Sequence, residues 1–452
     1  MTDTAASPIA VRTSPARRRE LTAATVGSVV ESFDWNMYAI LAPYLAAELF
    51  GEDGGLVQAY GGFAVGFFAR PLGGLLIGRF SDRHGRRAGL TLSMSVIALA
   101  SLGLALIPSA AVIGVGAALL AVAARLVQGL AYGGETPTVA AYVTETAPPR
   151  SRFLYSAVSY GGIVLGSLLS FGALAVLHAV LGRQGLDEGG WRWGFVIAAV
   201  LGLAALWVRR SAPESEDFEE ERRLRRTTAR QDSGSPVREA LLGHPWSMLS
   251  LFLFCVGGTV AFYCGLVYLP VYADGVGALG KEAASAFMPV VFVVTFAAML
   301  MAGVAADRFG GLRTMRAACL ALAGCTLPLM LGLRSGALPF EFVALAFGVL
   351  LAPVLMGNNV VLGLLFPTAV RAVGLGVGTA LTIAVFGGTF PMLAEWLQGR
   401  GWGGAVPFYV TLCALGPVAA TFTATRVPDF ARAMRSTRTS RTSRQETTDV
   451  PS

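Results

Sequence analysis

Long apolar segments recur along this chain and constrain its fold more than any other feature. An α-helix needs about 20 apolar residues to cross a bilayer. Twelve segments meet that length, at 22–47, 56–78, 88–108, 111–143, 153–181, 192–210, 246–273, 284–305, 315–333, 339–366, 371–397 and 405–425. Because lipid cannot satisfy backbone hydrogen bonds, each segment is predicted to be helical throughout. The predicted fold class is an all-α membrane protein with twelve transmembrane helices.

The composition supports a membrane protein and excludes several soluble classes. Hydrophobic residues make up 54% of the 452 residues and charged residues 14%, whereas soluble domains carry about 25% charged residues. A water-soluble enzyme and a disordered chain are therefore excluded. The five cysteines and three histidines show no metal-ligand spacing, so neither a metal site nor a disulfide framework is predicted.

The distribution of basic residues predicts the orientation in the membrane. With the N-terminus inside, most of the 35 basic residues fall in cytoplasmic segments, and the external loops hold only Arg183, Arg192, Lys281, Arg334 and Arg400. This asymmetry follows the positive-inside rule. The net charge of +7 therefore reflects topology rather than nucleic-acid binding. We expect a multi-pass protein of the inner (plasma) membrane with both termini cytoplasmic.

One long polar stretch divides the chain into halves. The expected organisation is a cytoplasmic tail (1–21), a six-helix bundle (22–210), a cytoplasmic linker (211–245), a second six-helix bundle (246–428) and a disordered tail (429–452). The first apolar segment lacks the short uncharged centre and small-residue cleavage site of a signal peptide. It is therefore expected to remain as the first membrane helix.

A loop motif recurs at equivalent places in the two halves. Gly78-x3-Asp82-Arg83-x-Gly85-Arg86-Arg87 follows the second span, and Gly303-x3-Asp307-Arg308-x-Gly310 follows the eighth. Six spans per half with the same orientation indicate a parallel repeat of two six-helix bundles. The motif residues lie outside the membrane, so their expected role is conformational gating, shared with Glu145 and Arg150.

The first loop motif resembles the signature of the major facilitator superfamily. Further motifs resemble its metabolite:proton symporter branch: Glu31-Ser-Phe-Asp34-Trp, Arg70-Pro-Leu-Gly, Arg125-Leu-Val-Gln128-Gly, Gly133-Gly-Glu135 and Phe366-Pro-Thr. The resemblance implies proton-coupled import of organic acids, or of zwitterions such as proline and betaine. It also implies alternating access, a monomer, and no cofactor beyond the proton gradient.

Two acidic residues lie inside the first predicted span. Glu31, Asp34 and Tyr38 follow the i, i+3, i+7 spacing that places them on one helix face. Two ionised carboxylates one turn apart repel each other, so one of them is expected to hold a proton more readily. Reversible protonation would serve proton coupling. The alternative is that one carboxylate is a fixed counter-ion of an arginine.

The fourth span places Arg125, Gln128, Tyr132 and Glu135 on one face. Because arginine does not readily lose its proton, Arg125 needs an anionic partner. That partner is either a first-span carboxylate, with Arg125 permanently paired to Asp34, or the carboxylate of a substrate. The proton-coupling candidates are therefore Glu31, Asp34, Arg125 and Glu135.

The second half has almost no charge within its spans. Its polar candidates are Tyr263, Asn358 and Asn359, which either line a cavity or bond between helices, since buried amides need partners. The substrate-binding candidates are Tyr38, Arg125, Gln128, Tyr132, Tyr263, Asn358 and Asn359. Glu341 and Glu395 lie near external ends and are expected to be solvated.

Among function classes, import of a small organic acid or zwitterion with protons is the leading prediction. The first alternative is a proton-antiport exporter. It is disfavoured because the fifth span, with Gly161, Gly162 and Gly166, lacks the Gly-Pro motif of many exporters in this superfamily. The remote alternative is a non-transporting receptor. An enzyme is not predicted, because the sequence shows no nucleophile–base pair and no phosphate-binding loop.

Overall fold

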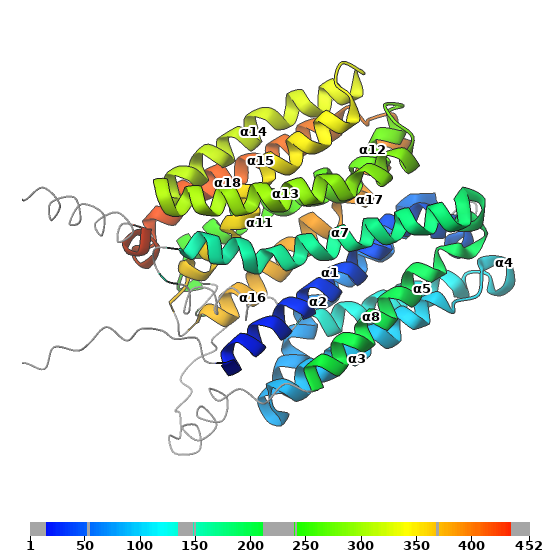
Figure 1. Cartoon of the computed structure of the whole chain (residues 1–452), viewed down its shortest axis with the longest axis horizontal. Coiled ribbons are helices and arrows are strands. Elements are labelled where there is room, and N and C mark those ends of the chain that lie inside the picture. Colours follow the sequence, from blue (N-terminus) through cyan, green and yellow to red (C-terminus); the bar gives the residue numbers. More distant parts are fainter. Residues whose placement is uncertain are drawn as a thin grey trace, which may run out of the picture.

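The computed structural model describes residues 15–51, 55–133, 148, 151–210, 239, 242–367 and 370–434 (Figure 1). All the regular secondary structure in these ranges is helical. The all-α prediction is confirmed. We use "first half" for the helices up to Arg210 and "second half" for those from Pro245 onward.

Each helix of the first half falls in one of the six predicted spans, of which residues 134–143 of the fourth lie outside the described residues. They are α1 (Pro15–Phe50), α2 (Gly55–His84), α3 (Arg86–Ala105), α5 (Gly116–Tyr132), α7 (Arg152–Gly185) and α8 (Arg192–Arg210). The short helix α4 (Ala110–Ile113) precedes α5, and the π-helical turn η2 (Leu186–Gly190) follows α7.

Two of the six spans in the second half contain a π-helical segment. α11 (Pro245–Phe262) continues through η3 (Tyr263–Tyr268) into α12 (Leu269–Gly275), and α16 (Arg371–Thr382) continues through η4 (Ile383–Gly388) into α17 (Phe390–Gly399). The others are α13 (Lys281–Phe309), α14 (Gly311–Arg334), α15 (Phe340–Leu365) and α18 (Ala405–Thr423), which ends in the turn η5 (Ala424–Arg426). π-Helical turns often occur at functional sites.

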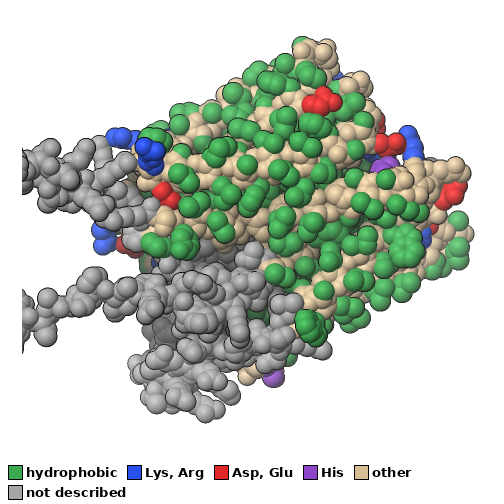
Figure 2. Space-filling view, viewed as in Figure 1, with side chains coloured by type: hydrophobic (Ala, Val, Ile, Leu, Met, Phe, Trp, Pro, Cys, Tyr) green, Lys and Arg blue, Asp and Glu red, His purple; other side chains and the backbone are tan. Residues whose placement is uncertain are grey.

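The outer surface is that of a membrane protein. In the described ranges, nine helical segments are long and apolar enough to cross a bilayer. Two shorter apolar helices (Gly116–Tyr132 and Arg192–Trp207) and α1 complete the twelve predicted spans. Figure 2 shows hydrophobic side chains over the sides of the helices, with charged groups mainly toward the two ends.

The two halves form neighbouring bundles, with α7 against α13 and α2 against α17 (Figure 1). We call the end where α1 begins and α18 finishes the termini end. The opposite end, which carries α4, is the loop end.

Glycines bring α2 and α5 together backbone to backbone. A Cβ at Gly129 would lie 2.0 Å from the carbonyl oxygen of Gly66, and one at Gly133 would lie 2.1 Å from that of Arg70. No side chain fits in these gaps, as in other tight membrane helix pairs. This close approach brings the arginines of α2 and α5 to the same aromatic side chain of α1.

Candidate functional site

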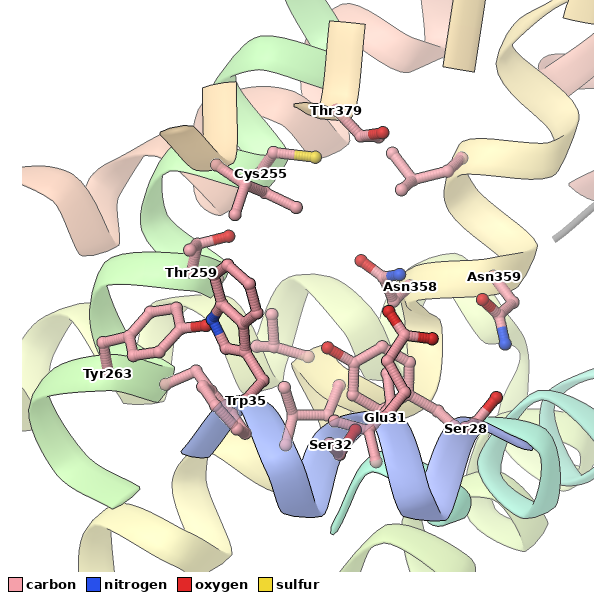
Figure 3. Close-up of a pocket in the computed structure, with 18 of the residues that line it drawn as sticks. Ser28, Glu31, Ser32, Trp35, Cys255, Thr259, Tyr263, Asn358, Asn359 and Thr379 are labelled. Atoms are coloured by element: carbon pink, nitrogen blue, oxygen red, sulfur yellow. The ribbon is translucent and has the colours of Figure 1, made fainter. Parts of the chain in front are cut away.

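A cavity of about 190 Å³ lies between the two halves (Figure 3). Its polar wall includes Ser28, Glu31, Ser32, Asn36, Arg70, Thr259, Asn358, Asn359 and Thr379. Aromatic side chains complete the wall: Trp35, Phe67, Tyr160, Phe254, Phe262 and Tyr263. Because Ser28 and Glu31 precede Trp35 along α1, the cavity extends from Trp35 toward the termini end.

Aromatic rings from both halves close the cavity toward the loop end. The ring centroids of Phe67 and Tyr263 are 5.7 Å apart, and those of Phe63 and Tyr263 are 5.8 Å apart. Trp35 packs edge-on against Phe67, with the centroids 4.5 Å apart. Edge-to-face pairs at these distances are favourable. The cavity therefore ends in an aromatic layer shared by α1, α2 and η3.

Two guanidinium groups stack on the indole of Trp35. The Cζ atom of Arg70 lies 3.9 Å from its ring centroid, and that of Arg125 lies 4.0 Å from it. Two planar groups cannot both sit at these distances on one face without overlapping, so the indole lies between them. Arg70 lines the cavity, whereas Arg125 is fully buried on the other side of Trp35.

Asp34 and Arg125 are linked through Gln128. The amide of Gln128 accepts a hydrogen bond from Nη1 of Arg125 at 2.8 Å and donates one to Oδ2 of Asp34 at 3.0 Å. All three side chains are fully buried. Among the described residues, Asp34 has no ion pair within 4.0 Å. The alternative in which Arg125 pairs with Asp34 therefore takes a bridged form, through Gln128.

Two hydroxyl groups complete the surroundings of Asp34. Ser101 donates a hydrogen bond to Oδ1, and Tyr132 donates one to Oδ2 at 2.7 Å. Each hydroxyl has a second acceptor in reach: the carbonyl of Ile97 lies 3.0 Å from Ser101 Oγ, and that of Glu31 lies 3.1 Å from Tyr132 Oη. A protonated Asp34 would donate one hydrogen bond instead of accepting it. The hydroxyl of Ser101 or Tyr132 could accept that bond while its own hydrogen turns to the nearby carbonyl, so that no buried donor is left unsatisfied.

The structure separates the predicted substrate contacts into two groups. Tyr263, Asn358 and Asn359 line the cavity, as does the predicted coupling residue Glu31. Nδ2 of Asn359 is buried without a hydrogen-bond partner in the described part of the chain.

The other four predicted contacts lie outside the lining, a difference from the expected site. Arg125, Gln128 and Tyr132 form the Asp34 network, and Tyr38 donates a hydrogen bond to the carbonyl of Ala59 at 3.1 Å. Helical spacing places residues on one face, but it does not determine which neighbouring side chain covers that face. Here Trp35 covers it.

The sequence interpretation assigned no role to several residues that line the cavity. Arg70 and Trp35 belong to the quoted motifs without a predicted role of their own, and Thr259, Cys255 and Thr379 are not among the predicted site residues. The position of Arg70 within an apolar span could have indicated a functional role. Placing a charged residue in the membrane interior costs free energy, so such residues are functional candidates.

The gating residues are described in part. Glu145 and Arg150 lie outside the described residues, as do the side chains of Asp82, Arg86 and Arg87. The predicted coupling residue Glu135 also lies outside them. Gly85 joins α2 to α3 with φ +104°, in the region that favours glycine. Gly78 lies within α2, and Arg83 and Arg308 are exposed.

Asp307 connects the two halves at the termini end. Its carboxylate oxygens accept hydrogen bonds from the backbone amides of Phe153 and Leu154, at 3.0 and 2.9 Å. These amides belong to the first turn of α7. A carboxylate is favoured there because a helix N-terminus presents free N–H groups and positive partial charge.

Tyr268 connects the halves at the loop end. Its hydroxyl donates to Oε1 of Glu395 at 2.6 Å, and Gln398 donates to it at the same distance. Its ring meets that of Tyr60 in the first half at 5.9 Å. The expected solvation of Glu395 is therefore wrong, since this carboxylate is half-buried in a polar cluster, whereas Glu341 is exposed as predicted.

Comparison with known proteins agrees with this architecture. A family model described as Major Facilitator Superfamily matches residues 24–391. The alpha-ketoglutarate permease of Escherichia coli K12 is 31% identical over 414 residues, which cover 89% of this chain and 93% of that protein. The ectoine/proline transporter ProP of Corynebacterium glutamicum is 30% identical over 389 residues, covering 82% and 76%.

A solved structure supports the same fold. The xylose transporter XylE from E. coli, in a partially occluded inward-open conformation, superimposes with a TM-score of 0.71. It is 20% identical in sequence, and the match covers 91% of this chain and 98% of the xylose transporter. The chain therefore belongs to the major facilitator superfamily, in its metabolite:proton symporter branch, and is a transporter rather than an enzyme.

Proposed function

We propose that this chain imports a small organic carboxylate or zwitterion together with protons by alternating access. The environment of Asp34 carries this proposal, because it is a fully buried carboxylate whose hydroxyl partners have alternative acceptors. Such a group can gain and lose a proton without breaking the surrounding packing. The relatives include an alpha-ketoglutarate permease and an ectoine/proline transporter, which supports this substrate range.

The proposed coupling uses the bridged network around Asp34. Protonation of Asp34 removes the negative charge that balances Arg125 through Gln128. The net charge of this network then differs between the empty and loaded carrier, which changes the cost of reorienting the two halves. Glu31 is a second candidate on the same helix, since it lines the cavity.

Alternating access is proposed to exchange the contacts at the two ends. The Asp307–α7 bonds would open and close the termini end, and the Tyr268–Glu395–Tyr60 cluster the loop end. We further propose that the termini end faces the cytoplasm of a cell whose plasma membrane holds the protein. The proton gradient would be the energy source without a cofactor. The working unit would be a monomer of two bundles, 22–210 and 246–428, with a linker between them.

Uptake into proteoliposomes tests the proposal. With an acidic exterior, the protein should accumulate a labelled carboxylate or betaine above its external concentration, and a protonophore should abolish the accumulation. An imposed sodium gradient without a pH gradient is the control, and it should give no accumulation. Concentrative uptake that survives the protonophore, or that requires sodium, would contradict proton symport.

A further inference from the structure

Arg70 lies at the wall of the cavity and has no anionic partner within the part of the chain that the structure describes. Among the described residues, no carboxylate lies within 4.0 Å of its guanidinium, and its Nε is buried without a hydrogen-bond acceptor. Its close contacts are aromatic: the faces of Trp35 at 3.9 Å and Phe67 at 4.6 Å from Cζ. Stacking on aromatic faces stabilises a cation, but it leaves the planar fork of N–H donors available to a ligand.

Arg125 differs from Arg70 although both stack on the same indole. Arg125 is completely buried, donates to Gln128, and through it is balanced by Asp34. Trp35 separates it from the cavity. A ligand in the cavity therefore meets Arg70 and cannot reach Arg125 unless Trp35 moves.

The charge of the wall limits how many carboxylates a ligand can carry. Among the described lining residues, the charged side chains are Arg70 and Glu31. One guanidinium matches one carboxylate in a bidentate pair, and a second carboxylate would share the wall with Glu31. The rest of the wall is aromatic or neutral, with Tyr263 and Asn358 contributed by the second half.

We infer that Arg70, held over the ring of Trp35, binds the carboxylate of a substrate that carries a single carboxylate group, and that Arg125 does not contact the substrate. This inference rests on the proposed transport of carboxylates. It divides the two arginines by function: Arg70 recognises the substrate and Arg125 serves the proton site. The body of the substrate packs against Phe67 and Tyr263, with the Asn358 amide opposite.

The same geometry gives a route from substrate to proton site. The guanidinium groups on the two faces of Trp35 repel each other, because both carry a full positive charge in a membrane interior where charges are weakly screened. A carboxylate bound at Arg70 neutralises one of them. Substrate binding therefore alters the charge balance around Arg125 and Asp34 without touching either residue.

Counterflow exchange in proteoliposomes, without a pH gradient, tests this inference apart from proton coupling. The probes are labelled L-lactate, quinate and glycine betaine, with one carboxylate each, and succinate and 2-oxoglutarate, with two. Arg70→Gln should raise the KM for exchange of a one-carboxylate probe about ten- to hundredfold, since a charge-assisted pair is lost. Arg70→Lys should give an intermediate KM, because it keeps the charge but not the fork.

A matched variant controls for folding and for the loss of an arginine that lies over a tryptophan, and Arg125→Gln tests the division between the two arginines. Arg426 also stacks on a tryptophan, with Cζ 4.1 Å from the ring of Trp246, but it is exposed outside the cavity. Arg426→Gln should leave the KM within twofold of wild type. Arg125→Gln should raise the exchange KM much less than Arg70→Gln, because Arg125 acts on the bound carboxylate only through its charge, and it should abolish gradient-driven accumulation. An Arg70→Gln protein that does not fold leaves the Arg70→Lys comparison as the test.

The outcomes separate this inference from the proposed function. If wild type exchanges none of the probes, the proposed carboxylate transport is contradicted. If the wild-type protein exchanges the probes and Arg70→Gln has the same KM as wild type, the role of Arg70 is overturned. If Arg70→Gln does not fold, a wild-type KM in Arg70→Lys overturns it instead. A KM for succinate or 2-oxoglutarate as low as that for the one-carboxylate probes would overturn the single-carboxylate assignment. An equal KM increase in Arg125→Gln would overturn the division between the arginines.

Discussion

The two halves of this transporter have the same helical architecture and opposite chemistry at their shared cavity. The first half buries Asp34 and Arg125 and lines the cavity with Glu31 and Arg70. The second half presents Tyr263 with neutral amides and hydroxyls. Placing a charge in a membrane interior is costly, and the cost falls when charges are grouped so that they compensate one another.

This asymmetry indicates that the two halves have different functions. The first half holds both the proposed proton site and Arg70, the arginine proposed to bind the substrate. The two are therefore coupled over a short distance, through the indole ring of Trp35. The cavity-lining surface of the second half is neutral, so its movement relative to the first half moves no uncompensated charge through the bilayer. The comparison therefore predicts that substitutions of the buried charges of the first half change coupling, whereas substitutions of the second-half residues that line the cavity change affinity alone.

The largest effect is expected from Asp34→Asn. The amide cannot exchange a proton, so gradient-driven accumulation should fall to the level of empty vesicles while counterflow exchange continues. Uptake under an acid-outside gradient, measured beside exchange in the same vesicles, checks this. Glu341→Gln, which removes an exposed carboxylate, is the matched control. Accumulation by Asp34→Asn at half the wild-type level or more would show that the proton site lies elsewhere.

Arg125→Gln should destabilise the protein as well as uncouple it. It leaves the buried Asp34 network without its compensating cation, and removing one member of a buried pair costs about 3 kcal/mol or more. The double variant Asp34→Asn/Arg125→Gln should recover most of that loss, because neither charge then remains. Chemical unfolding in detergent micelles measures both. An unchanged unfolding midpoint in the single variant would mean that Asp34 is already neutral.

In the second half, Asn358→Ala should change affinity without changing coupling. Losing one hydrogen bond to the substrate should raise KM about tenfold at most. The ratio of protons to substrate, measured from parallel pH and label traces, should stay at the wild-type value. A changed ratio would break the comparison between the halves.

The smallest effect is expected from Asp307→Asn, which keeps an acceptor for the first turn of α7 but removes its charge. A charge at a helix N-terminus contributes about 0.3–1 kcal/mol, so the balance between conformations should shift by roughly two- to fivefold. The maximal exchange rate should change by that factor with KM unaltered. A tenfold or larger KM change would place Asp307 in substrate binding instead of gating.

The fold was largely predictable from the sequence because the bilayer imposes local rules. Every spanning segment satisfies its own backbone hydrogen bonds, so length and hydropathy alone locate it. The predicted span 192–210, for example, coincides with α8. The motifs of α1, α2 and α5 also indicated the family.

The candidate site was only half predictable, and Arg70 and Arg125 show why. Both are arginines inside apolar spans, and the sequence favoured Arg125 because it shares a helix face with Gln128 and Tyr132. Which arginine faces the cavity depends on how α1, α2 and α5 pack, with Gly66 and Gly129 in backbone contact. Sequence determined that charges lie inside the membrane. The position of Trp35 between the two arginines could not be predicted, because it depends on side chains from three helices meeting at one point.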